Sequence, residues 1–128
     1  MNLATLYKIF AVLHAVMALM MLFGGQMISN MNGWDHSIGI VTMAEHHGAA
    51  LLCVSLLFWM LPRWLSEEGL KDATSTALLV QAILAVMPIY HAAVGAIPAD
   101  ASLAVMMIVL LGLMYLFFQA AKKDPETE

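Results

Sequence analysis

Charged residues are scarce in this sequence. Only 11% of the 128 residues are charged, whereas 62% are hydrophobic. A soluble domain is typically about 25% charged and about 45–50% apolar. A chain of this length cannot enclose so much apolar side chain in a single core. The composition therefore excludes an ordinary water-soluble domain and predicts that lipid solvates most of the surface.

Cysteine and basic residues are also few, and their scarcity excludes several classes of protein. Cys53 is the only cysteine, which rules out an intramolecular disulfide, a CxxC redox pair and an all-cysteine metal site. Five Lys and Arg residues against nine Asp and Glu form no basic patch, so we expect no nucleic-acid partner. The glycine-rich, phosphate-loop, GxSxG and HExxH motifs of soluble enzymes are absent.

Long apolar runs fill most of the chain. A membrane helix needs about 20 mainly apolar residues to cross about 30 Å of hydrocarbon. We therefore expect an all-α membrane protein that forms an antiparallel, up-down-up-down four-helix bundle, with Asp72 or Ser75 capping the third helix. The predicted spans cover approximately residues 6–28, 42–61, 77–97 and 101–121, and a tail follows at 122–128.

The basic residues predict the orientation of the spans. They lie before the first span, between the second and third, and after the fourth, and they are Lys8, Arg63, Lys71, Lys122 and Lys123. The other two connections contain none. The positive-inside rule then places both termini and the middle loop in the cytoplasm.

Polar side chains inside the predicted spans are the candidates for chemistry, because such residues are costly in lipid and are functional hypotheses by default. At a rise of about 1.5 Å per residue, His91 lies near the outer third of the membrane. Glu45, His46 and His47 lie at a similar depth, and His14 lies near the middle. One interpretation is a transition-metal site built from Glu45, His46, His47 and His91. Another is a haem or quinone site that uses His91 and His46 with His14.

A structural interpretation competes with both. Glu45, His46 and His47 can be interfacial residues that water and headgroups solvate, and His91 can bind a carbonyl that Pro88 leaves without its donor. His14 shares one stripe of the first helix with Tyr7 and Met21, because the three are seven residues apart. This stripe is expected to face another helix, and His14 to make a structural hydrogen bond there. The sequence leaves the functional and structural alternatives open.

Methionine is abundant, with 12 residues. Met17 with Met21 and Met27 with Met31 each fit an MxxxM pattern, and soft thioethers select Cu(I). Methionine is also a routine filler of irregular apolar packing, and the fourth span carries it without any other candidate ligand. We expect packing to be the general role.

Small residues indicate where helices approach closely, because packing replaces the hydrophobic effect as the driving force in lipid. They occur in the second and third spans, as Ala44 with Gly48, and as Ala92, Gly95 and Ala96. These two spans are predicted to pack on each other or on a neighbouring copy.

The layout resembles small bacterial four-span membrane proteins of the DoxX-like kind. The resemblance rests on the first-span segment LHAVMALMMLFGG, on Gly33-Trp34-Asp35, and on the third-span ending YHAAVGAIP. It implies the bacterial cytoplasmic (inner) membrane and assigns no catalytic residue.

Three functions are consistent with these patterns. The leading one is a non-catalytic accessory subunit or self-assembling scaffold, whose partners are the lipid bilayer and either further copies or a larger membrane complex. The second is a metal-, haem- or quinone-binding protein that uses the outer histidines. The third is a small proton-coupled transporter with Glu45 and His91 on its path.

Overall fold

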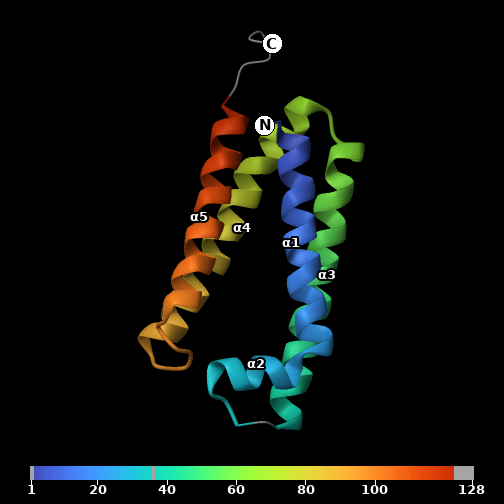
Figure 1. The fold of residues 1–128 in the computed structure, drawn as a ribbon. Coiled ribbons are helices and arrows are strands. Elements are labelled where there is room, and N and C mark those ends of the chain that lie inside the picture. Colours follow the sequence, from blue (N-terminus) through green and yellow to red (C-terminus); the bar gives the residue numbers. More distant parts are fainter. Residues whose placement is uncertain (1, 36, 123–128) are drawn as a thin grey trace. The chain divides into compact units, whose positions relative to one another are not determined.

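The computed structural model describes residues 2–35 and 37–122, and these residues fold into helices without a strand. Figure 1 shows their order along the chain. The predicted all-α class is confirmed, and four of the helices are long and apolar enough to cross a membrane. The predicted tail at 122–128 lies, apart from Lys122, outside the described residues. The five helices are α1 (Leu3–Phe23), α2 (Gly25–Asn32), α3 (Ile38–Trp64), α4 (Glu67–Ala93) and α5 (Ala101–Ala121).

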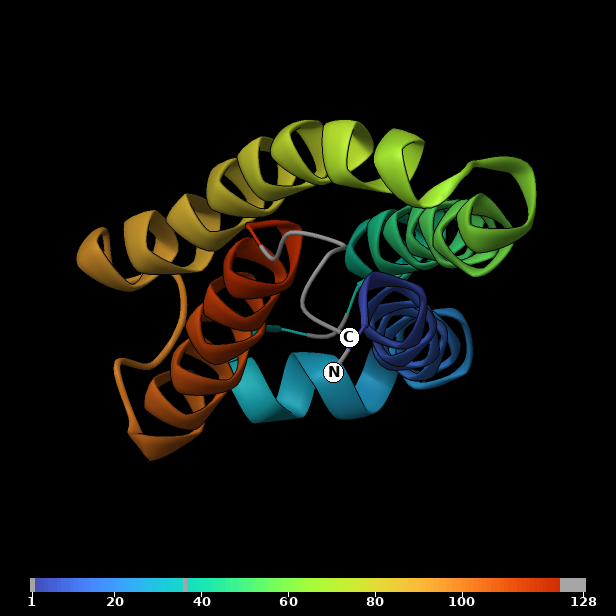
Figure 2. The ribbon, with the colours of Figure 1, turned by 90° about the horizontal axis from the view of Figure 1, so that it is seen from above.

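The predicted first span breaks in two. α1 ends at Phe23, and α2 runs across the end of α1 instead of continuing it (Figures 1 and 2). At Gly24, where the chain turns, a Cβ atom would lie only 2.5 Å from the carbonyl oxygen of Met20, so a side chain does not fit. The predicted boundary at residue 28 is therefore too late, because the sequence pattern counted the residues of α2 as part of the membrane run.

α2 ends in a motif that requires glycine. The Gly33 N–H donates to the carbonyl of Asn30, and the Trp34 N–H donates to the carbonyl of Ser29. These two bonds form a Schellman motif, in which the residue after the helix adopts a left-handed conformation. Gly33 has a φ of 67°, which residues with a Cβ atom rarely adopt.

The connection between α3 and α4 is shorter than predicted. α4 begins at Glu67, and Ser66 is its N-cap, whose side chain accepts a hydrogen bond from the Gly69 N–H. The expected caps, Asp72 and Ser75, lie inside the helix, where the Ser75 hydroxyl donates to the Asp72 carbonyl. That expectation was wrong, because it started the helix where the apolar run starts rather than where the first capping residue stands.

The described residues divide into two units. One comprises residues 7–61, and the other comprises residues 2–6 with 62–122. In the first unit, α1 and α3 lie side by side and run antiparallel (Figures 1 and 2). Ala18 near one end of α1 contacts Gly48, while Ala11 contacts Ser55.

The buried residues of α3 repeat at the intervals of a helix–helix seam. They are separated by three, four and three positions, which places them on one face, and they are Gly48, Leu51, Ser55 and Phe58. The buried residues of α1 in this unit follow the same spacing through Tyr7, Ala11, His14 and Ala18. Such a repeat is typical of two helices that pack at a shallow crossing angle.

The second unit contains α4 and α5, which contact each other. α4 ends at Ala93 in a second Schellman motif, where the Ala96 N–H donates to the His91 carbonyl at 2.8 Å. Gly95 has a φ of 74°, and a Cβ atom added there would meet nothing within 4 Å. Gly95 and Ala96 therefore lie beyond the helix whose packing face they were predicted to form, because the turn needs a glycine at this point.

α5 covers the same residues as the predicted fourth span. Its N-cap is Asp100, whose carboxylate accepts hydrogen bonds from the backbone N–H groups of Ser102 and Leu103, at 2.9 and 3.1 Å. The Leu103 bond, followed by the contacts with Ser102, lowers the pKa of Asp100 below its ordinary value. The carboxylate is thus held in the charged form that suits a helix N-terminus.

The close approach of α1 and α3 at Gly48 leads to a stability prediction. A Cβ atom at this position would lie 2.8 Å from the Ala18 carbonyl oxygen, which belongs to the backbone and cannot rotate away. Gly48→Ala should therefore lower the free energy of unfolding in mixed micelles by about 1–3 kcal/mol. Gly112→Ala is the matched control, because its Cβ atom would meet nothing within 4 Å. Equal stability of the two variants would contradict the packing.

Candidate functional site

The predicted site residues fall in different parts of the structure. His14 lies in the middle of α1, Glu45, His46 and His47 lie in the first half of α3, and His91 lies in the last turn of α4. His91 belongs to the second unit and the other four to the first. Its pairing with His46 or His47 stays a prediction. Within residues 2–35 and 37–122, no group of three or more His, Cys, Asp and Glu side chains lies close enough together to hold a metal ion.

His14 is buried between α1 and α3, with 8% of its surface exposed. Its Nδ1 lies 2.8 Å from the carbonyl oxygen of Phe10, one turn earlier, so Nδ1 carries the proton and donates it to that carbonyl. The ring centroid of Phe10 is 4.5 Å from that of His14, and Phe58 of α3 meets the imidazole edge-on at 5.8 Å. This is the helix-facing position and the structural hydrogen bond that the seven-residue spacing predicts.

Aromatic rings continue from His14 along the seam. Phe58 lies 5.5 Å from Phe10 and 5.7 Å from Tyr7 between ring centroids, with the Tyr7 pair close to edge-on. Such tilted and edge-on arrangements contribute about 0.5–1.5 kcal/mol per pair beyond the buried area. The α1–α3 seam is therefore an aromatic cluster near Tyr7, and it is built from small residues around Gly48.

Ser55 supplies a hydrogen bond between the two helices. Its Oγ donates to the carbonyl oxygen of Ala11 across the seam at 2.7 Å, and Ser55 is only 5% exposed. The sequence analysis did not identify this residue. Its place seven residues after Gly48 was the available signal, since residues seven apart share a helix face.

His46 has a different environment from His14. It is exposed, and its Nδ1 lies 2.8 Å from the carbonyl oxygen of Thr42. Because a carbonyl can only accept, Nδ1 carries the proton and the neutral ring has its lone pair on Nε2. Metal-binding histidines commonly use this arrangement, with one ring nitrogen fixed by a backbone carbonyl and the other free to bind.

The face of α3 that points away from α1 carries small and polar residues in its N-terminal half. Thr42, His46, Ala49 and Cys53 follow one another at intervals of four, three and four residues and are all exposed. We call these four residues the back face of α3. This face was not predicted, because the small-residue pattern indicated Ala44 and Gly48 instead, and the structure turns Gly48 toward α1.

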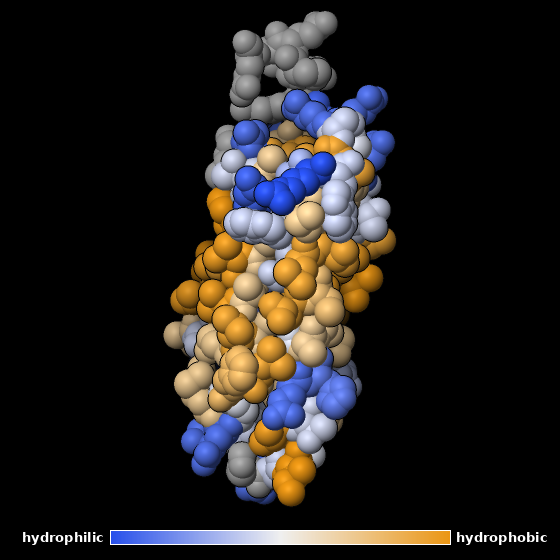
Figure 3. All heavy atoms as spheres, turned by 90° about the vertical axis from the view of Figure 1, so that its right-hand side faces the viewer, coloured by the Kyte–Doolittle hydropathy of each residue, from blue (hydrophilic) through white to orange (hydrophobic). Residues whose placement is uncertain are grey.

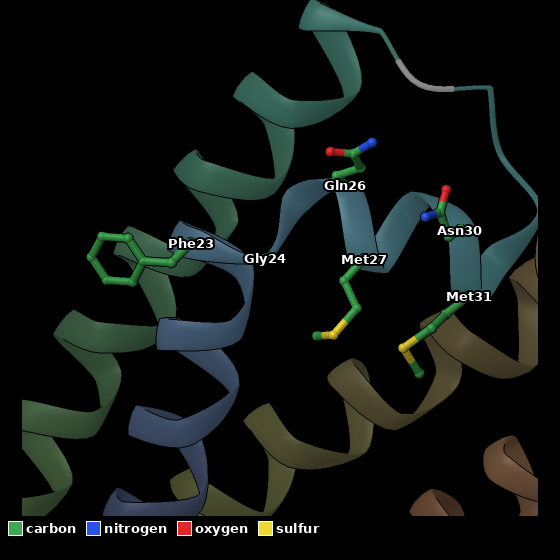
Figure 4. Close-up of a pocket in the computed structure, with 6 residues that line it drawn as sticks. All are labelled: Phe23, Gly24, Gln26, Met27, Asn30 and Met31. Atoms are coloured by element: carbon green, nitrogen blue, oxygen red, sulfur yellow. The ribbon is translucent and has the colours of Figure 1, made fainter.

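An open pocket lies where α1 gives way to α2 (Figure 4). Its volume is about 610 Å³, and it is lined by Phe23, Gly24, Gln26, Met27, Asn30 and Met31. In Figure 4, Met27 and Met31 project from one side of α2, and Gln26 and Asn30 project from the other. No sequence pattern indicated this pocket, because the turn at Gly24 creates it.

Gln81 is the polar residue at the centre of α4. It is 4% exposed, and its Nε2 has no hydrogen-bond partner within the part of the chain that the structure describes. Buried amide donors normally have an acceptor, because leaving one unpaired costs about 1–3 kcal/mol. Gln81 is thus a buried polar side chain of this helix whose amide donor the described residues do not satisfy.

Comparisons of the sequence with protein-family models and with curated proteins, and of the structure with solved structures, gave no match. The functional argument therefore depends on the geometry described above.

The Ser55 bond leads to a second prediction. Ser55→Ala removes the donor between α3 and α1, and we expect it to lower the free energy of unfolding by about 1 kcal/mol, as for other hydrogen bonds between membrane helices. Ser75→Ala serves as the control, since the Ser75 hydroxyl bonds only to Asp72 in its own helix at an exposed position. If both variants unfold at the same detergent concentration, the cross-helix bond does not hold the pair together.

Proposed function

We propose that this protein is a non-catalytic, multi-pass component of the bacterial inner membrane that assembles with a second copy of itself through the back face of α3. The observation that carries the proposal is the composition of this face. Thr42 and His46 are polar, Ala49 is small, and all three are exposed. Lipid offers such residues neither hydrogen bonds nor close packing, whereas another helix offers both.

α1 packs against one side of α3, so the back face on the opposite side is left for another partner. Gly48, the close-packing residue that the sequence suggested for assembly, is already occupied by α1. Thr42 and His46 therefore need a partner from outside the α1–α3 pair. Because Nδ1 of His46 donates to the Thr42 carbonyl, Nε2 is left as an acceptor. A copy in the same orientation would present its own Thr42 hydroxyl, a donor, on the same back face.

Both termini are proposed to lie in the cytoplasm, which fixes the orientation of every copy. The basic residues support this orientation. The ammonium group of Lys8 lies 6.0 Å from the centre of the Trp59 ring, near the end of α3 that carries Arg63. The opposite end of the α1–α3 pair, which includes α2, has no Lys or Arg. On the face shown in Figure 3, hydrophobic residues cover the middle and hydrophilic residues gather toward both ends.

Because every copy has the same proposed orientation in the membrane, the contact can be tested with the native sequence. Two copies related by a two-fold axis along the membrane normal bring like residues to the same depth. Cys53 lies on the back face and is the only cysteine in the chain. In the proposed dimer, the two Cys53 thiols face each other.

Oxidation by copper–phenanthroline in native membranes should therefore convert the wild-type protein to a disulfide-linked dimer. The readout is the fraction of dimer on a non-reducing gel. The matched control is Cys53→Ala combined with Val54→Cys, which moves the thiol one position along α3 and about 100° around the helix. We expect little dimer from this control.

Two results would overturn the proposal. One is equal dimer yield from the wild type and from the control, which indicates random collision. The other is a wild-type yield that falls in proportion to protein density when the protein is diluted into excess lipid.

A second candidate function is favoured by the His46 ring. With Nδ1 bound to the Thr42 carbonyl, Nε2 is available to a metal or haem iron. If this function is correct, protein purified gently from its native membrane should show a haem absorption band or contain stoichiometric metal. His46→Ala should remove the signal, whereas His47→Ala, which points about 100° away, should retain it. A colourless, metal-free wild type would exclude this candidate.

A further inference from the structure

Met27 and Met31 form a pair of thioethers on α2 that packing does not explain. They are four residues apart, so they share one side of the helix, and both side chains line the pocket at the end of α1 (Figure 4). Met27 is 46% exposed and Met31 is 60% exposed. A methionine that fills a gap in a core is buried, and these two are not.

The setting of the pair differs from that of the other MxxxM pair. Met17 and Met21 lie within α1, an uninterrupted apolar helix long enough to span a membrane, where exposed apolar side chains are solvated by lipid. α2 is a separate helix of eight residues that also carries Ser29 and three amide side chains. The two methionines of α2, with Ile28, are therefore apolar residues in a segment that is half polar, and both lie beside an open pocket.

The turn at Gly24 between α1 and α2 determines the position of Met27. Gly24 has no side chain, and a Cβ atom built there would lie 3.4 Å from the methyl carbon of Met27. The Met27 thioether thus folds back to the turn between α1 and α2, within van der Waals distance of where a Cβ atom at position 24 would lie. This places Met27 at one edge of the pocket, with Met31 one turn further along α2.

We propose that Met27 and Met31 bind a soft monovalent cation, Cu(I) or its analogue Ag(I), at the mouth of this pocket. Thioether sulfur is a soft ligand, which prefers Cu(I) to the hard cations that carboxylates and carbonyls bind. The site is independent of the proposed assembly, because α2 and the back face of α3 use different residues.

The charge distribution also suits a cation. Residues 24–35, which contain α2 and the described turn after it, include Asp35 and no Lys or Arg. No fixed positive charge in that segment therefore opposes a bound cation. The amide side chains of Gln26 and Asn30, which line the same pocket, offer polar groups to the water molecules that complete the coordination of an exposed ion.

The test is titration of the purified full-length protein with silver nitrate in chloride-free buffer, followed by calorimetry. The starting protein carries Cys53→Ala, because a free thiol would bind Ag(I) more strongly than any thioether. In this background, Met27→Leu with Met31→Leu should weaken binding by about tenfold or more, since both soft ligands are lost. Leucine conserves the volume and the apolar character of methionine, so membrane contacts of α2 are retained.

The control is Met17→Leu with Met21→Leu, which changes a pair of the same spacing in the same unit and should leave the affinity unchanged. Methyl-¹³C methionine spectra of the Cys53→Ala protein give a second readout, in which Ag(I) should shift the Met27 and Met31 resonances first. Unchanged affinity in the Met27/Met31 variant overturns the proposal, as does an equal loss in both variants. If the Met27/Met31 variant does not fold, the spectra decide, because no early shift of those two resonances would also overturn it.

Discussion

Hydrocarbon provides no hydrogen-bond partners, and this constraint is reflected in the bonds that polar side chains inside the helices make. Most of these side chains return to a carbonyl one turn earlier in their own helix. Bonds of this type run from His14 to Phe10, Ser29 to Gly25, Asn32 to Ile28, His46 to Thr42 and Thr74 to Leu70. Each of these bonds satisfies one polar atom of the side chain within its own helix and leaves any other polar atom to be satisfied elsewhere.

Ser55 departs from this rule, and the α1–α3 seam depends on the exception. Its hydroxyl reaches the Ala11 carbonyl of the other helix, which requires the two backbones to lie close together. Gly48 permits that distance seven residues earlier on the same face. The aromatic cluster around Phe58 then closes the end of the seam near Tyr7. One face of α3 thus contacts α1 in three ways: by close packing at Gly48, by the Ser55 hydrogen bond and by the aromatic cluster around Phe58.

The sequence was sufficient to predict the helical class and the extent of the last long helix. Both follow from long uninterrupted apolar runs, such as that of residues 101–121. Helix ends were harder to predict, because a helix extends past the hydrocarbon as long as caps and turns allow. Ser66 therefore begins α4 well before Ala77, and the chain turns at Gly24 inside an apparently continuous run.

The direction in which the candidate site residues point was only partly predictable. The seven-residue repeat through His14 correctly indicated a helix-facing side, because several residues of α1 shared it. A single pair, Ala44 and Gly48, carried no such information on which neighbour it faces. The back face of α3 depends on how this helix is rotated about its axis, and the pocket beside Met27 depends on the turn at Gly24. Neither feature leaves a periodic signal in the sequence.

The turn at Gly24 also sets the length of α1. α1 has 21 residues, which corresponds to about 32 Å and is close to the hydrocarbon thickness of an average bilayer. α3 has 27 residues, or about 40 Å, and is too long to stand upright within the same layer. Because the two helices are joined along their seam, α3 cannot tilt alone to relieve the mismatch. Its surplus turns must emerge into the headgroup region, so membrane thickness determines how deeply Thr42 and His46 are immersed.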